Sequence, residues 1–286
     1  MNLQIKRFPL YLLMIFICMT TICAQVKIDF GNNPDAGNWV MVNETKLYYE
    51  TYGVGQPLLL IHGNGGSIHS MRFQIDFFMS KYKIVVADSR GQGKSKIDDG
   101  ELNYTQMADD LASLLDHLKI DSARIVGWSD GGILGLLLAI HHPNKVSRLA
   151  IMGANLQPDT SAVYQFAIDE VKLWDTQIDK GIKMLDKSKD WQMLKKLNRL
   201  LLEQPDIKIN ELRKITCPVL VMAGDRDFIR EEHTVRIFQN IPKAQLCIFP
   251  GNTHYVPVTA PTLFNETVYR FLSEPFSMPK SKFYEE

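Results

Sequence analysis

The stretch RIVGWSDGGILGLLLAI, residues 124–140, places a serine between two apolar runs. Glycine stands two residues before Ser129 and two residues after it, and Asp130 follows the serine directly. A short apolar run that ends near glycine is typical of a buried strand, whereas the longer run after Gly131 has the length of a helix. The stretch therefore predicts a strand over residues 123–129, a helix over residues 131 to about 142, and a serine presented at the turn between them.

Apolar runs without strict alternation occur along most of the chain, and segments with helical spacing separate them. The predicted strands are residues 46–53, 57–66, 83–91, 123–129, 146–154, 218–225 and 244–251. The predicted helices are residues 67–82, 104–118, 131–142, 231–240 and 261–273. Strands of this kind favour a parallel sheet with helices on both faces, so the predicted fold class is α/β with a mostly parallel sheet.

Residues 155–215 interrupt this alternation, because they are rich in Lys, Asp, Leu and Trp at helical spacing and contain no clear strand. The segment predicts a small helical cap inserted between two strands of the sheet. The α/β core is then divided into residues 25–154 and residues 216–286. The large side chains of the cap would either line a pocket or pack the cap onto the core: Tyr164, Phe166, Trp174, Trp191 and Leu200.

The composition limits the classes of partner. The chain has 286 residues, 45% of them hydrophobic, which is enough for one sizeable core. Lys and Arg together number 32, as do Asp and Glu, so the net charge is zero and gives no reason to expect recruitment to nucleic acid or to an anionic membrane. We expect a small-molecule substrate and make no prediction of the oligomeric state.

Residues 1–24 have the pattern of a secretory signal peptide. Lys6 and Arg7 precede an apolar run that ends near Ala24, and cleavage there would export the chain to the periplasm or the medium. The alternative is an uncleaved N-terminal membrane anchor, although the apolar run is short for a bilayer span of about 20 residues. After cleavage Cys217 and Cys247 remain, and the pattern fits either buried thiols or a bridge between them.

Ser129 lies where a strand is expected to end, and in a parallel sheet the reacting groups come together at the carboxyl ends of the strands. A serine hydroxyl is a weak nucleophile until a base takes its proton and an acid orients that base. His254 follows the last predicted strand in a polar loop and is the candidate base, whereas His62 precedes a glycine-rich loop and is expected to stiffen that turn. The two candidate acids, Asp225 and Asp227, lie at the end of the preceding predicted strand, residues 218–225.

From about residue 40 to residue 272 the chain resembles the α/β-hydrolase superfamily. The motifs HGNGG, DSRGQGKS, GWSDGG, AGDRD and GNTHYV occur in the order of that family, and the order Ser, Asp, His matches its triad. The resemblance implies the α/β-hydrolase fold and a catalytic triad of Ser129, Asp227 and His254. Asp227 is preferred because the acid of this family usually falls three residues after the glycine that ends its strand, and Asp225 is the alternative.

The tetrahedral intermediate of such a reaction needs two backbone N–H donors aimed at its oxyanion. One expected donor is Asp130, the residue after the nucleophile, and the other is Asn64 of the HGNGG loop, with Gly65 as second choice. The loop lacks the Gly-Lys-Ser/Thr ending of a phosphate cradle. Trp128 and Gly65 are predicted to contact the substrate together with Asp130. The DSRGQGKS turn is assigned to the scaffold by the resemblance, and no cofactor or metal site is predicted.

Asp130 is an unusual neighbour for a nucleophile that acts on apolar esters. Its carboxylate would suit a substrate that carries an amine close to the scissile ester. The GWSDGG motif is similar to the biphenyl hydrolase-like, valacyclovirase-type branch of the family, and this resemblance implies that Asp130 holds the α-amino group of an amino-acid ester. In the alternative, its side chain points away and serves as a charge at the helix N-terminus.

The predicted function is hydrolysis of a small carboxylic ester through an acyl-enzyme intermediate, with an amino-acid ester as the narrower prediction. The alternatives are a carbon–carbon bond or enol-lactone hydrolase of the same fold, and a non-catalytic α/β-hydrolase-like binding protein. An intact set of Ser129, Asp227 and His254 argues against the binding protein, and a serine at position 129 argues against relatives that use an aspartate nucleophile.

Overall fold

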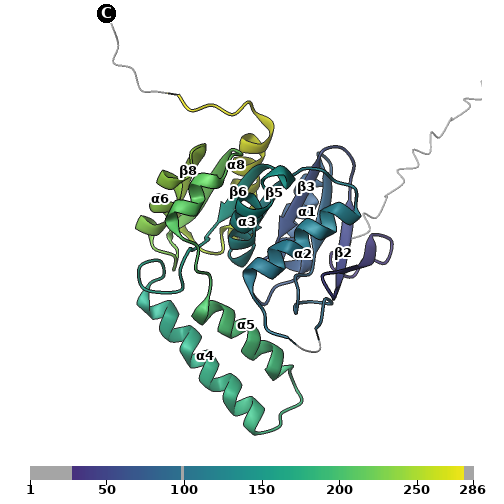
Figure 1. Cartoon of the computed structure of the whole chain (residues 1–286), viewed down its shortest axis with the longest axis vertical. Helices are drawn as coiled ribbons and strands as arrows, with labels where there is room; N and C mark the ends of the chain where they lie inside the picture. The colour runs from purple at the N-terminus through teal and green to yellow at the C-terminus, as the bar shows by residue number, and fades with distance from the viewer. Residues whose placement is uncertain (1–27, 98–99, 280–286) are drawn as a thin grey trace, which may run out of the picture.

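The computed structural model describes residues 28–97 and 100–279, so the predicted signal peptide lies outside the described residues. An eight-stranded sheet runs through the molecule in the order β1-β2-β4-β3-β5-β6-β7-β8 (Figure 1). The strands are β1 (Gly37–Val42), β2 (Thr45–Tyr52), β3 (Pro57–Ile61), β4 (Lys83–Ala87), β5 (Ala123–Trp128), β6 (Val146–Met152), β7 (Val219–Arg226) and β8 (Ala244–Thr253). β2 pairs antiparallel with β1 and with β4, and every other pair is parallel. The predicted α/β fold with a mostly parallel sheet is confirmed.

Helices cover both faces of the sheet, as buried apolar strands require. The core helices are α1 (Arg72–Phe78), α2 (Tyr104–His117), α3 (Asp130–His141), α6 (Glu231–Asn240), α7 (Val256–Thr259) and α8 (Pro261–Ser273), with short 3-10 turns η1 (Ile68–Met71), η2 (Pro143–Lys145) and η3 (Ile209–Lys214). One apolar cluster contains the buried side chains of α2, α3 and α6, and a second contains those of α1, α7 and α8. The sheet therefore separates two layers of core.

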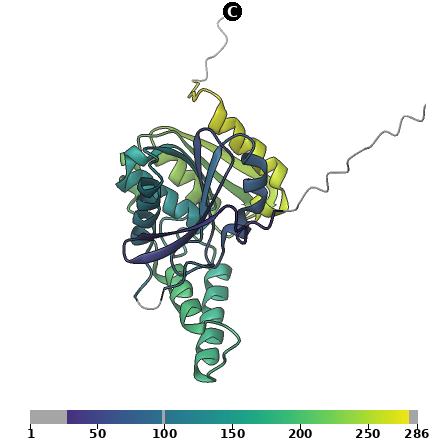
Figure 2. The ribbon, with the colours of Figure 1, turned by 90° about the vertical axis from the view of Figure 1, so that its right-hand side faces the viewer.

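The expected cap consists of α4 (Gln165–Lys183) and α5 (Trp191–Glu203), which follow β6 and precede β7. The two helices pack against each other and extend away from the sheet (Figures 1 and 2). The carboxyl ends of β3, β5, β7 and β8 lead directly into the segments that contain Asn64, Ser129, Asp227 and His254. The predicted site residues are therefore brought to one edge of the sheet.

β1 is a strand that the sequence pattern does not predict, because its side chains are mostly exposed or half-buried and give no continuous apolar run. β1 forms a hairpin with β2 through Asn43 and Glu44, whose φ angles are 43° and 62°. Two residues with positive φ between antiparallel strands are typical of a tight hairpin turn. The antiparallel edge of the sheet thus depends on turn geometry rather than on hydrophobic pattern.

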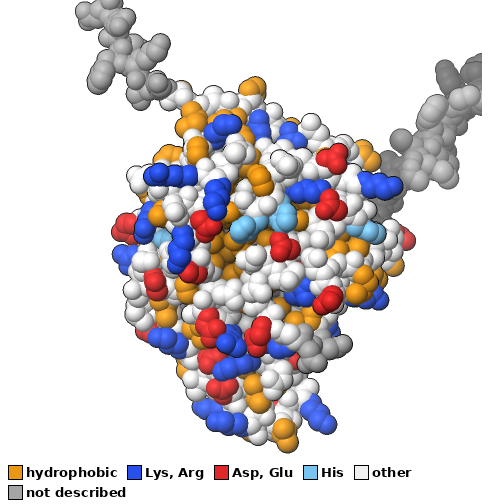
Figure 3. Space-filling model, in the orientation of Figure 1, with side chains coloured by type: hydrophobic (Ala, Val, Ile, Leu, Met, Phe, Trp, Pro, Cys, Tyr) orange, Lys and Arg blue, Asp and Glu red, His pale blue; other side chains and the backbone are white. Residues whose placement is uncertain are grey.

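The two cysteines of the described chain are free thiols, so the bridge between them is not formed. Burial raises the pKa of the Cys217 thiol to about 11, which keeps it protonated and unreactive at neutral pH. Among residues 28–97 and 100–279, no helix is long and apolar enough to cross a membrane. Lys and Arg side chains are interspersed with Asp and Glu over the face shown in Figure 3, in keeping with the zero net charge.

Candidate active site

Ser129 occupies the sharp turn between β5 and α3. Its φ of 59° and ψ of −122° form a strained backbone conformation for a residue with a side chain, and its N–H donates to the Met152 carbonyl oxygen at 2.8 Å. A Cβ at Gly127 would lie 2.0 Å from the Gly131 carbonyl oxygen, and one at Gly131 would lie 2.1 Å from the Ile61 carbonyl oxygen. The two glycines therefore permit a turn that presents the serine side chain above the sheet.

His254 and Asp227 form a buried pair at the same edge. The Nδ1–H of His254 donates to Asp227 Oδ1 at 2.8 Å, and the same oxygen accepts the backbone N–H of Ile229 at 3.0 Å. The second ring nitrogen, Nε2, has no hydrogen-bond partner in the described part of the chain. Asp225, the alternative acid, makes no hydrogen bond to His254. The structure thus pairs the candidate base with Asp227.

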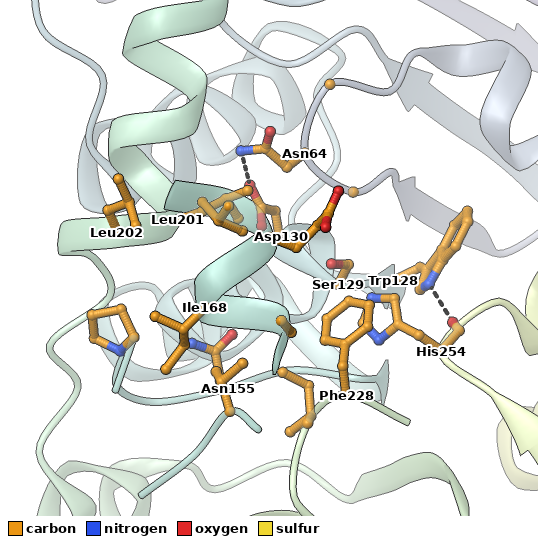
Figure 4. Close-up of a pocket in the computed structure, with 18 of the residues that line it drawn as sticks. Asn64, Trp128, Ser129, Asp130, Asn155, Ile168, Leu201, Leu202, Phe228 and His254 are labelled. Atoms are coloured by element: carbon orange, nitrogen blue, oxygen red, sulfur yellow. Dashed lines mark hydrogen bonds between the residues drawn. The ribbon is translucent and has the colours of Figure 1, made fainter. Parts of the chain in front are cut away.

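Aromatic side chains fix the position of the His254 ring. Phe228 stacks on the imidazole with ring centroids 3.9 Å apart and an interplanar angle of 29°. Trp128 donates its indole N–H to the His254 carbonyl oxygen at 2.9 Å. Figure 4 shows Ser129 beside this group, with Phe228 and His254 overlapping in the view. Trp128, expected only as a substrate contact, therefore also holds the backbone of the candidate base.

The expected oxyanion donors border the same cavity as Ser129. Asp130 is the first residue of α3, so its N–H is one of the unpaired donors at the positive end of a helix. Within residues 28–97 and 100–279, the backbone N–H of Asn64 has no protein acceptor either. Gly65 also lines the cavity and has a φ of 65°, a conformation that glycine adopts without strain. Both preferred donors are available to a ligand.

His62 stiffens the glycine loop, as expected from its position. Its Nε2 accepts the backbone N–H of Ser89 at 3.0 Å, and its Nδ1 contacts the Gly63 carbonyl oxygen at 2.8 Å. These contacts require the neutral ring with its proton on Nδ1. Burial lowers the pKa of His62, which favours the same neutral form. The two His62 hydrogen bonds therefore fix the position of the loop that carries Asn64.

The side chain of Asn64 makes contacts that the sequence did not indicate. Its Nδ2 donates to Asp130 Oδ2 at 3.0 Å and to the Leu197 carbonyl oxygen of α5 at 3.2 Å. The Tyr104 side chain is fully buried near the Asp130 carboxylate, yet its hydroxyl makes no hydrogen bond in the described part of the chain. Tyr104 begins a predicted helix and resembles a core residue in the sequence, so no local signal marks it.

Asp130 is 2% exposed, and burial raises the pKa of its carboxyl group to about 6. The hydrogen bond from Asn64 opposes this shift, as do interactions with Tyr104 and His254. The carboxylate is therefore largely ionised at pH 7 and becomes neutral in mildly acidic solution. Its side chain points toward Asn64 (Figure 4) and borders the cavity, so it is more than a helix-end charge facing solvent.

A cavity of about 790 Å³ connects these groups to the cap. Its lining from the cap segment is mostly apolar: Val163, Phe166, Ile168, Val171, Trp174, Leu201 and Leu202. Of the described residues that line it, two are carboxylates, Asp130 and Glu170, and none is Lys or Arg. The cavity is therefore mostly apolar. Its end beside Ser129 contains the Asp130 carboxylate, and we call this end its acidic pole.

The large cap side chains divide between the two roles left open by the sequence. Phe166 and Trp174 line the cavity, and Tyr164 stacks on Phe166. Trp191 instead packs over Gly181, where a Cβ would lie 2.5 Å from the indole ring, and Leu200 is buried in the main core. The cap thus contributes aromatic side chains to the cavity, and Trp191 of α5 packs its two helices against each other.

Comparison with known proteins identifies the class. The α/β hydrolase fold family model matches residues 56–183. RutD of Caulobacter sp. (strain K31), whose name describes a carbamate hydrolase, is 31% identical over 258 residues, which cover 79% of this chain and 96% of RutD. The serine hydrolase BPHL of Mus musculus is 26% identical over 251 residues, covering 82% of this chain and 85% of BPHL. An esterase from Exiguobacterium antarcticum superposes with a TM-score of 0.73 at 23% identity, over 83% of this chain and 100% of the esterase.

The matches to RutD and to the esterase cover 79% and 83% of this chain, so they include most of the described residues. The chain belongs to the α/β-hydrolase superfamily, and it is a hydrolase. The predicted resemblance to this superfamily is confirmed. The likeness to the esterase structure concerns the fold alone.

Proposed function

We propose that this hydrolase cleaves a small carboxylic ester that carries a free amine close to the scissile carbonyl, as an amino-acid ester does. The observation that carries the proposal is the acidic pole of the cavity, where Asp130 lies directly after Ser129 and no Lys or Arg lines the described cavity. A substrate ammonium group would neutralise a carboxylate that is otherwise buried without a cation. The apolar cap wall would hold the rest of the molecule.

The chemistry follows from the positions of the three candidate catalytic residues. Ser129 Oγ attacks the carbonyl carbon while its proton passes to His254 Nε2, the ring nitrogen left free by the pairing of Nδ1 with Asp227. The backbone N–H groups of Asn64 and Asp130 hold the oxyanion that forms. The ester bond breaks as His254 gives the proton to the leaving alcohol, and water then releases the acid from Ser129 by the reverse sequence.

Similarity to BPHL, a protein named as a serine hydrolase, supports the serine-based route. Similarity to RutD, named as a carbamate hydrolase, supports attack on a carbonyl next to nitrogen or oxygen. A non-catalytic binding role would not require a strained serine elbow and a buried His254–Asp227 pair at 2.8 Å. We also propose export from the cytoplasm, which rests on the pattern of residues 1–24 alone.

The proposal is tested by comparing an aminoacyl ester with its N-acetylated twin, with Ser129→Ala as the blank. We expect kcat/KM to favour the free amine by about 10- to 100-fold, the value of a desolvated charge pair, and Asp130→Ala to abolish that preference. Equal rates on both esters would overturn the amine-recognition part. Hydrolysis of neither ester above the blank would overturn the ester assignment in favour of carbamate, carbon–carbon or enol-lactone substrates.

The preference should also depend on pH. Asp130 has a pKa of about 6 and acts through its ionised form, whereas an α-amino group is protonated below about pH 8. The preference for the free amine is therefore expected to be largest between about pH 6 and pH 8 and to fall below pH 6, as Asp130 becomes protonated. The ratio of kcat/KM for the two esters, measured from pH 5 to pH 9, isolates this effect, because catalytic groups shared by both reactions act on the two esters alike.

A further inference from the structure

The carboxamide of Asn64 connects three parts of the site. Its nitrogen has two hydrogens, and the structure gives each one an acceptor: Asp130 Oδ2 at 3.0 Å and the carbonyl oxygen of Leu197 at 3.2 Å. The first contact is the dashed line between Asn64 and Asp130 in Figure 4. The second reaches from the loop after β3 to the cap helix α5, 133 residues further along the chain.

The two residues joined by the first contact are the two that carry the expected oxyanion donors. Asn64 would donate from the loop after β3, and Asp130 would donate from the first turn of α3. No covalent connection shorter than 66 residues joins these two backbones. The bond between their side chains is therefore a direct link between the two donors.

We propose that the Asn64 side chain is a positioning residue that braces the two oxyanion donors against each other and ties them to the cap through Leu197. The inference rests on the proposed function, because it assumes that both backbone N–H groups hold the oxyanion. The brace lies in a half-buried site and ends on a carboxylate, so its bond is charge-assisted. Displacement of a catalytic group by about 1 Å can cost on the order of 100-fold in rate.

The brace should act on the chemical step rather than on binding. Oxyanion contacts strengthen as charge develops in the transition state, so a misplaced donor lowers kcat more than it raises KM. Asn64→Ala removes the carboxamide but keeps the backbone N–H at position 64. We expect it to lower kcat on the neutral, N-acetylated ester by about 10- to 100-fold, with KM changed by less than about threefold.

Asp130 variants separate the brace from recognition of the amine. Asp130→Asn keeps a side-chain oxygen that can accept from Asn64, but it removes the negative charge. On the neutral ester we expect Asp130→Ala to lose about as much kcat as Asn64→Ala, and Asp130→Asn to recover at least about 10-fold of that loss. The preference for the free amine should be absent in both Asp130 variants, which makes the two functions of Asp130 independently measurable.

A double-mutant cycle on the neutral ester gives the decisive result. If Asn64 and Asp130 act through their mutual bond, the double variant Asn64→Ala/Asp130→Ala should have kcat within about threefold of either single variant. Asn240→Ala, at a half-buried asparagine that ends α6 far from the cavity lining, serves as the matched control and should leave kcat unchanged. Thermal unfolding of each variant checks that the fold is retained.

The brace is overturned if Asn64→Ala has the wild-type kcat, or if the losses of the two alanine variants multiply in the double variant. Failure of the proposed function would look different, because then the wild-type enzyme itself would cleave neither ester above the Ser129→Ala blank. A merely structural role would also lower the apparent kcat with KM unchanged, so it is excluded by two other results: unchanged thermal unfolding of Asn64→Ala, and recovery of kcat in Asp130→Asn relative to Asp130→Ala.

Discussion

Replacement of Ser129 by alanine is expected to lower kcat for ester hydrolysis by about 10⁴- to 10⁶-fold, and replacement of His254 by alanine should have an effect of the same order. In the proposed mechanism the two residues act in one proton transfer, in which His254 Nε2 receives the proton that Ser129 Oγ loses. The double variant should therefore be no slower than either single variant. Steady-state kinetics on the best-cleaved ester measures all three, and residual activity would report the oxyanion donors alone.

Asp227 has a smaller expected effect, because in the proposed mechanism it orients His254 through their hydrogen bond and does not touch the substrate. We expect Asp227→Asn to lower kcat by about 10⁴-fold. Asp225→Asn is the matched control, since Asp225 lies in the last residues of β7, two residues before Asp227, and makes no hydrogen bond to His254; its kcat should stay within about threefold of wild type. An Asp225→Asn variant as impaired as Asp227→Asn would contradict the assignment of the acid.

The second large effect concerns the glycines that allow the elbow. A Cβ at Gly131 would lie 2.1 Å from the Ile61 carbonyl oxygen, and one at Gly127 would lie 2.0 Å from the Gly131 carbonyl oxygen. Both partners are backbone atoms of packed elements, so neither can turn aside. Gly131→Ala is expected to lower the free energy of unfolding by about 3 kcal/mol or more, measured by urea unfolding, and to abolish activity.

Gly251→Ala is a control that separates the stability cost of steric overlap from the cost of an unfavourable backbone conformation. Gly251 has a φ of 68°, but a Cβ there would meet no atom within 4 Å, so Gly251→Ala should cost only about 1 kcal/mol. Gly131 is not among the glycines with positive φ, so its penalty is purely steric. Equal losses of stability for the two alanine variants would show that the elbow is looser than the structure indicates.

The fold and much of the candidate site follow from local patterns. A parallel sheet needs strands buried on both faces, and the apolar runs that end at Ser129 and before Asp227 and His254 show this directly. The order of the strands then brings the three residues to one edge, whatever the details of the loops. The choice of Asp227 over Asp225 came from the family resemblance, and the hydrogen bond to His254 agrees with it.

The remaining features depend on contacts between distant segments. Asn64 was expected to act through its backbone, and nothing near it in the sequence indicates that its side chain reaches Asp130 and the cap carbonyl of Leu197. Tyr104 has the pattern of a core residue at the start of a helix, although its hydroxyl lies close to the Asp130 carboxylate. Such contacts arise from the packing of distant segments of the core and the cap against one another, which hydrophobic periodicity does not encode.

The central claim is that Ser129 is a nucleophile activated by His254, and covalent labelling tests it most directly. A fluorophosphonate probe followed by peptide mass spectrometry should give one adduct, on the peptide that contains Ser129. Labelling should be absent in Ser129→Ala and strongly slowed in His254→Ala, with both variants folded. A wild-type protein that does not label, or labelling that persists in Ser129→Ala, would contradict the account and favour a binding protein built on the same fold.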